Sequence, residues 1–137
     1  MNSLLRTAAL AAFVTLATAA ALAGDIIANI VTIDGDTIRQ GQTRIRMVDY
    51  DTPEIHSPKC AAEKALGEKA KQRLEGLLAN ASDIQILPSG KRDTDYFGRK
   101  LRLVMVDGRS VGEILIAEGL AVKWTGRKPN WCQKLGG

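Results

Sequence analysis

Three short runs of β-strand composition, separated by two tight turns, constrain the fold of this chain more than any other feature. Asp25–Ile33 is rich in β-branched residues, Thr43–Tyr50 alternates polar and apolar residues, and Thr37–Arg39 lies between them. Asp34-Gly35-Asp36 and Gln40-Gly41-Gln42 have the composition of turns. Because strands joined this closely pair with their neighbours, the sequence predicts a three-stranded meander.

A long amphipathic helix is predicted after the meander. Ser57 would cap its N-terminus, and Pro58 would take the first helical position, where an N–H group is not needed. Apolar residues then recur every four positions to about Leu78, and Leu77 widens the stripe. This predicted apolar face consists of Ala62, Leu66, Ala70, Leu74 and Leu78.

The remainder of the domain is predicted to return to strands. Asp83–Leu87 and Arg99–Val106 have strand composition, and the polar loop Lys91–Gly98 separates them. Ser110 begins a short capped helix that Gly119 ends. Five strands with a helix after the third fit an α+β fold, mainly β: a five-stranded Greek-key barrel of the OB type with packed helices. Composition alone does not select this barrel over other small α+β folds.

The first 23 residues have the composition of a secretory signal peptide. Met1–Ala23 carries one charge, at Arg6, followed by an uncharged Ala- and Leu-rich run that ends in Ala21-Leu22-Ala23. An uncleaved membrane anchor is the alternative, since the run is near the lower length limit for spanning a bilayer. We expect one exported domain over Gly24–Gly137, periplasmic or secreted, with no stable membrane association after cleavage.

Removal of Arg6 lowers the formal net charge from +4 to +3, with 18 basic against 15 acidic residues. A positive balance of this size suits an anionic partner, although many domains carry as much. The two cysteines, Cys60 and Cys132, could form a disulfide in an oxidising compartment or remain free thiols. Together with the single histidine they do not make a zinc ligand set.

Two groups of acidic residues flank the third predicted strand. Asp36 and Asp51 could supply two carboxylates, and the backbone carbonyl of Thr52 a third oxygen, to a hard divalent cation. Glu54 is a spare carboxylate that could orient and deprotonate a water molecule. Taken alone, the first group reads as an ordinary hairpin turn, and the second as the segment before a helix.

Two arginines complete the pattern. Arg46 precedes Asp51 by five residues, and Arg99 begins a later strand. A guanidinium grips phosphate oxygens in a bidentate way and stabilises the charge that grows during phosphoryl transfer. Each arginine alone reads as a solvated surface charge. Residues 46 and 51 also have opposite strand parity, so they converge only if the strand bends between them.

These residues lie in segments that resemble the staphylococcal nuclease-like (thermonuclease) family. The segments are Ile33–Ile38 (IDGDTI), Arg44–Glu54 (RIRMVDYDTPE), Asp95–Arg99 (DYFGR) and Asp107–Ala121 (DGRSVGEILIAEGLA). They occur in the order and with the spacing of the family and cover most of residues 24–123. Each segment is weak evidence alone, but the ordered set is specific.

The resemblance implies an OB-fold nuclease with two or three packed helices that hydrolyses DNA and/or RNA with Ca²⁺, cleaving on the 5′-oxygen side of phosphorus. By motif, Asp36, Asp51 and the Thr52 carbonyl match the calcium ligands, with Asp34 as a nearby acid. Glu54 matches the proposed general base. The phosphate-binding arginines are matched by Arg46 and Arg99. The alternative is a non-catalytic nucleic-acid-binding OB domain.

The C-terminal part departs from the family, which has a longer last helix and two tyrosines near the nucleotide. Those places hold Thr125 and Arg127 here, so base stacking is expected either to use Trp124 or to be weaker. Lys59 and Tyr96 are further expected substrate contacts. A Cys60–Cys132 disulfide would tie the shortened tail to the first helix. We expect a monomer.

Overall fold

The computed structural model describes residues 29–90 and 92–136 of the chain. The predicted signal peptide, residues 1–23, and the start of the strand predicted at Asp25 lie outside the described residues. The elements in chain order are β1 (Ile30–Asp34), β2 (Thr37–Gln40), β3 (Thr43–Met47), β4 (Tyr50–Asp51), α2 (Ala61–Asn80), β5 (Ile84–Pro88), β6 (Lys100–Val106), β7 (Arg109–Ser110), α3 (Val111–Ala117), β8 (Val122–Lys123) and α4 (Trp131–Lys134). The α+β class is confirmed.

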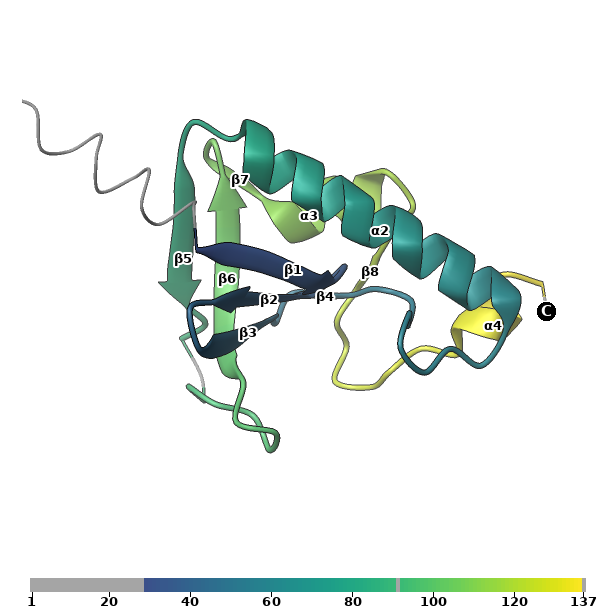
Figure 1. The fold of residues 1–137 in the computed structure, drawn as a ribbon. Coiled ribbons are helices and arrows are strands. Elements are labelled where there is room, and N and C mark those ends of the chain that lie inside the picture. The colour runs from purple at the N-terminus through teal and green to yellow at the C-terminus, as the bar shows by residue number, and fades with distance from the viewer. Residues whose placement is uncertain (1–28, 91, 137) are drawn as a thin grey trace, which may run out of the picture.

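One mixed sheet forms the centre of the molecule, with strand order β1-β2-β3-β6-β5 and the short β7 paired to β6. The meander β1-β2-β3 is antiparallel, as predicted, while β3 and β6 run parallel. Helix α2 lies across one side of the strands, and α3 lies close to the sheet between α2 and β6 (Figure 1). The largest fully buried side chains are Tyr50, Ile38, Met47, Leu74 and Leu115, contributed by both the strands and the helices.

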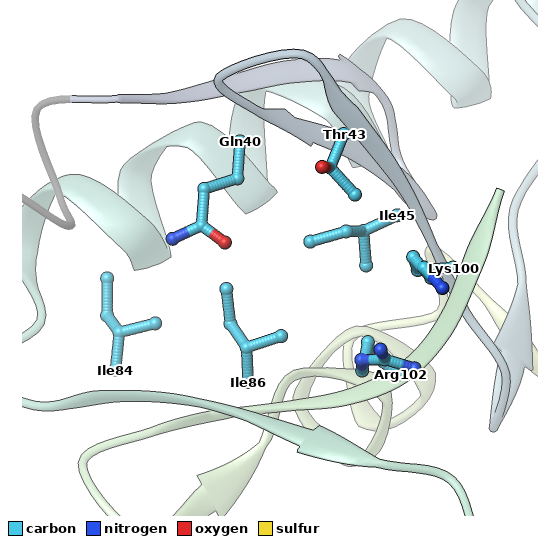
Figure 2. A pocket seen from close by; sticks show the side chains of 7 residues that line it. All are labelled: Gln40, Thr43, Ile45, Ile84, Ile86, Lys100 and Arg102. Atoms are coloured by element: carbon cyan, nitrogen blue, oxygen red, sulfur yellow. The ribbon is translucent and has the colours of Figure 1, made fainter. Parts of the chain in front are cut away.

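The sheet is open on one side within the part of the chain that the structure describes, because β1 and β5, its two edges, are not paired with each other. A cavity of about 500 Å³ is lined by residues of β2, β3, β5 and β6. Figure 2 shows Ile84 and Ile86 pointing across it toward Gln40 and Ile45. The strand order therefore agrees with the predicted five-stranded sheet, and the closure of a barrel is left as an expectation.

The third predicted strand is divided, which corrects the expected continuous run to Tyr50. β3 ends at Met47, the chain bends at residues 48 and 49, and β4 pairs with β8 instead of continuing the main sheet. Trp124 N–H donates to the Asp49 carbonyl at 3.0 Å, and the buried Tyr50 hydroxyl donates to the Gly35 carbonyl at 2.8 Å. These contacts hold the bend between β3, which pairs with β2 and β6, and β4, which pairs with β8.

The first long helix begins later than predicted. Cys60, not Ser57, is the N-cap of α2, and its sulfur accepts from the Glu63 N–H group. The Glu63 carboxylate in turn accepts from the Lys59 N–H at 2.7 Å, which holds the preceding residues outside the helix. The predicted apolar face is correct from Ala70 to Leu78, but Ala62 is exposed and Glu63 and Gly67 are buried in the first two turns.

The short helix α3 follows the prediction closely. Ser110 is its N-cap, with its hydroxyl accepting from the Glu113 N–H at 3.3 Å. Gly119, which has a positive φ of 74°, follows its end. No helix in the described part of the chain is both long and apolar enough to cross a membrane.

Candidate active site

A cleft of about 970 Å³ gathers most of the predicted site residues. Its lining side chains come from the β1–β2 turn, from β3 and β4, from the loop before β6 and from the C-terminal segment. They are Asp34, Asp36, Arg44, Arg46, Val48, Asp51, Glu54, His56, Ser89, Arg92, Asp95, Tyr96, Phe97, Arg99, Leu101, Trp124 and Lys128. The acids and arginines that were predicted from separate motifs therefore line the same cleft.

Arg46 lies between two buried carboxylates at the floor of this cleft. Its Nη1 forms an ion pair with Asp36, and its Nη2 lies 3.0 Å from Asp51 Oδ1. Asp36 and Asp51 are 7% and 1% exposed. The bend after β3 makes this possible, because it reverses the parity that would otherwise place residues 46 and 51 on opposite faces.

The β1–β2 turn is packed so closely that its central residue has to be a glycine. A Cβ at Gly35 would lie 2.7 Å from Thr52 Oγ1 and 2.8 Å from the Ala70 Cβ. Burial raises the pKa of Tyr50 well above its usual range, so its hydroxyl remains a donor to the Gly35 carbonyl. This packing sets the Asp36 carboxylate beside the Thr52 backbone, whose N–H donates to Asp36 Oδ2 at 3.0 Å.

The charges of the cluster do not balance. Burial lowers the pKa of Arg46, Asp51 opposes this, and the neighbouring Arg99 lowers it further. The guanidinium nevertheless stays charged, because its ordinary pKa lies far above neutral pH. One buried cation thus faces two buried carboxylates, with Asp34 also lining the cleft.

The donor set fits a hard divalent cation. Two buried carboxylates with a net negative charge, next to a fixed backbone segment at residue 52, offer the oxygen ligands that Ca²⁺ prefers. Few protein ligands would leave room for water or a phosphate oxygen in the same coordination shell. Asp36 and Asp51 both pair with Arg46, and the Thr52 backbone contacts Asp36. The role of these three residues as cation ligands stays a prediction.

Arg99 is held at the edge of the cleft by Asp95. Its Nε lies 2.7 Å from Asp95 Oδ2, and its backbone N–H donates to Asp95 Oδ1 at 2.9 Å. Its guanidinium carbon lies 5.5 Å from the centre of the Phe97 ring. Burial acts to raise the pKa of Asp95, but the hydrogen bonds from Arg99 and Phe97 outweigh it, so that this pKa is lowered.

Glu54 also lines the cleft, and it pairs with Lys128. Its own N–H donates to Glu63 Oε1 at 3.3 Å, which fixes the backbone that carries it. The sequence analysis assigned no role to Glu63. Its spacing of three residues from Cys60 was the available signal.

The three expected substrate contacts differ in their positions. Tyr96 lines the cleft but is 92% exposed, and its ring packs edge-on against Phe97, with 5.6 Å between centroids. Trp124 is 38% exposed and lies beneath Arg46, whose guanidinium carbon lies 5.9 Å from the ring centroid. Lys59 is not among the residues that line the cleft.

The C-terminal segment contributes more to this site than its sequence indicated. Cys60 and Cys132 form a disulfide with 6.0 Å between their Cα atoms, which joins the start of α2 to α4 as expected. Trp131 is 4% exposed, and its indole N–H donates to Asp51 Oδ2 at 2.9 Å. A tryptophan next to a disulfide cysteine was the only sequence signal for this contact, and it does not identify the partner.

The sheet and the cleft define the chain as a small α+β domain whose acids and arginines line one cleft. The family model described as "Staphylococcal nuclease homologue" matches residues 44–134, and the chain belongs to this family. The resemblance inferred from the motifs is thereby confirmed.

Two Bacillus subtilis (strain 168) proteins are similar to the chain. The chain is 39% identical to endonuclease YncB over 94 residues. The aligned region covers 65% of this chain and 43% of that protein. The chain is also 39% identical over 94 residues to the SPbeta prophage-derived endonuclease YokF, covering 65% of this chain and 31% of that protein. The chain thus spans less than half of the length of the curated relatives it matches.

Proposed function

We propose that this protein is a Ca²⁺-dependent nuclease that hydrolyses phosphodiester bonds of DNA and/or RNA by in-line attack of water. The observation that carries the proposal is the convergence of Asp36, Arg46 and Asp51 in one cleft with Arg99 and Glu54. Membership of the nuclease family, and similarity to two proteins named as endonucleases, support the same activity.

Asp36, Asp51 and the Thr52 carbonyl would hold the cation, with Asp34 beside them. When bound, Ca²⁺ supplies positive charge that polarises the scissile phosphate. The low number of protein ligands favours binding of cation and substrate together, because a phosphate oxygen can complete the coordination shell.

Glu54 would accept the proton of the attacking water, since its carboxylate reaches the cleft from outside the buried cluster. Arg46 and Arg99 would hold the phosphate oxygens and stabilise the transition state. Carboxylates already orient both arginines. Asp36 and Asp51 pair with Arg46, and Asp95 pairs with Arg99. Cleavage on the 5′-oxygen side is carried over from the family.

Tyr96 and Trp124 are proposed to stack on bases next to the scissile phosphate, since both line the cleft. Lys59 is not proposed as a substrate contact, because its side chain does not line the cleft. The OB-type closure of the sheet into a barrel belongs to the proposal as well, and it rests on family membership.

Export to the periplasm or the medium, after cleavage of residues 1–23, is supported by the signal-like sequence and by the disulfide. We propose that the exported domain, residues 24–137, acts as a monomer.

The test is cleavage of single-stranded DNA and RNA by purified Gly24–Gly137, with Ca²⁺ and then with a chelator. A double variant, Glu54→Gln with Arg99→Ala, is measured beside it. Cleavage that needs Ca²⁺ and disappears in the variant supports the proposal. A folded, Ca²⁺-loaded protein that retains DNA at low salt but does not cleave it would favour a binding domain instead.

A further inference from the structure

The C-terminal segment, residues 124–132, contacts three predicted functional residues at once. Trp124 lies under Arg46, Lys128 pairs with Glu54, and the Trp131 indole donates to Asp51. The segment is anchored at both ends. β8 pairs with β4 just before it, and Cys132 is bonded to Cys60 at its end.

The contact of Trp131 is the most specific of the three. Asp51 Oδ1 faces Arg46, and Oδ2 accepts the indole N–H at 2.9 Å, so both carboxylate oxygens have a donor. The indole nitrogen can only donate. Since Trp131 and Asp51 are 4% and 1% exposed, water does not compete freely for this bond. The bond therefore fixes the direction of the Asp51 carboxylate.

The helix that carries Trp131 has four residues, too few to be stable alone. The Asn130 side chain caps it, and α4 packs against the start of α2 (Figure 1). The covalent bond lies one residue from Trp131, at Cys132. Next to it, Glu63 Oε2 lies 3.7 Å from Cys132 Sγ, and the same carboxylate accepts from the Glu54 N–H. The disulfide thus lies next to Glu63, which holds the Glu54 backbone, and one residue from Trp131, which contacts Asp51.

We propose that Trp131 is a positioning residue for the Asp51 carboxylate, and that the Cys60–Cys132 disulfide holds it there. Trp131 touches neither substrate nor cation; it acts by presenting Asp51 in the orientation that binds the cation. This inference rests on the proposed function, in that Asp51 is taken to be a cation ligand. Loss of a hydrogen-bond partner behind a ligand typically weakens metal affinity about 10- to 100-fold.

The first test is the Ca²⁺ affinity of Trp131→Phe, measured by calorimetry on the oxidised protein. The substitution keeps an apolar ring and removes the N–H donor. We expect the Kd for Ca²⁺ to rise about tenfold or more, and the Ca²⁺ concentration for half-maximal cleavage to rise with it. Ile114→Val, a buried change in α3 away from the cleft lining, controls for a general loss of stability and should leave the Kd unchanged. An unchanged Kd in folded Trp131→Phe would overturn the role of Trp131.

The second test needs neither Ca²⁺ nor substrate. Hydrogen exchange of the Trp131 indole N–H, followed by NMR in the presence of chelator, is compared between the wild type and the double variant Cys60→Ser/Cys132→Ser. We expect exchange at least about tenfold faster in the variant, because the tether that orders α4 is lost. Equal rates would show that the disulfide does not hold Trp131. Failure of the nuclease proposal would instead appear as a wild type that does not cleave, with the indole still protected.

Discussion

At the scale of single residues, Arg46 compensates part of the negative charge of two buried carboxylates. It is the shared partner of Asp36 and Asp51, and its side chain is 12% exposed. Removing one partner of a buried ion pair costs roughly 3–5 kcal/mol, because the remaining charge is buried without compensation. The same guanidinium is proposed to stabilise the transition state, so stability and activity both depend on it.

Arg46→Ala is therefore expected to lower the free energy of unfolding in chelator by several kcal/mol, on the scale of about 3–5. Added Ca²⁺ should recover more stability than it adds to the wild type, since it would neutralise the unpaired carboxylates. The cleavage rate should fall about a hundredfold or more. Urea unfolding with and without Ca²⁺ measures the first effect. Arg44→Ala, an exposed residue of the same strand, is the control and should change stability by less than about 0.5 kcal/mol.

The pKa of Asp95 gives a prediction about acid pH. Burial would raise this pKa, but the hydrogen bonds from Arg99 and Phe97 lower it below the ordinary value. A carboxyl group with a lowered pKa in the folded state stabilises the protein above the unfolded-state pKa of about 3.9, and this contribution is lost as the pH falls through the folded pKa.

The difference in unfolding free energy between the wild type and Asp95→Asn should accordingly be constant near neutral pH. It should shrink below about pH 4. Urea unfolding between pH 7 and pH 2.5 measures this difference. A difference that stays the same across that range would contradict the assignment of the stabilisation to the ionised carboxylate.

The residue types of the site could be predicted from the sequence, but their contacts could not. Asp36, Asp51, Arg46 and Arg99 were recognised from short motifs, and all four line the cleft. The Arg46–Asp51 contact depends on a bend between them that strand periodicity does not encode. The Trp131–Asp51 contact joins residues 80 positions apart, and no local pattern specifies such a pairing.

At the scale of elements, local signals predicted the turns of the meander, strands β5 and β6 and the capped helix α3, because turns and caps are decided by neighbouring residues. They did not predict the break of the third strand after Met47. The start of α2 was misplaced for the opposite reason. Ser57-Pro58 is a good local cap signal, but the hydrogen bond from the Glu54 N–H to Glu63 and the disulfide at Cys60 keep residues before Ala61 out of the helix. Long-range contacts outweighed the local preference there.

The packing of α2 against the chain around Glu54 leads to a prediction. A Cβ at Gly67 would lie 2.7 Å from both the Ile55 Cγ2 and the Pro53 carbonyl oxygen. Gly67→Ala should push α2 away from this segment, cost about 1–3 kcal/mol of stability, and reduce cleavage by displacing Glu54.

Gly76→Ala in the same helix is the matched control. A Cβ there meets nothing within 4 Å, so the change should stabilise the protein by up to about 1 kcal/mol through helix propensity and leave cleavage unaffected. Urea unfolding measures the stability of both variants, and cleavage assays measure their activity. Equal effects at the two positions would mean that the close approach at Gly67 is not rigid.

At the scale of the whole molecule, the net charge of +4 is small, and its distribution matters more than its size. Three basic residues in the cleft are already paired with acids, Arg46, Arg99 and Lys128. Arg44 and Arg92 also line the cleft and are exposed. If nucleic acid follows this cleft, these two arginines should neutralise phosphates, whereas basic residues elsewhere should not.

The salt dependence of single-stranded DNA binding tests this distribution, with Glu54→Gln as the background to prevent cleavage. Each phosphate contact contributes about 0.7 to the slope of log Kobs against log salt, so Arg44→Ala/Arg92→Ala should make the slope shallower by about 1.4. Lys64→Ala/Arg109→Ala removes the same charge from exposed positions outside the cleft and should leave the slope unchanged. If both pairs reduced the slope equally, the DNA would be responding to the overall charge of the protein, and the path through the cleft would have to be abandoned.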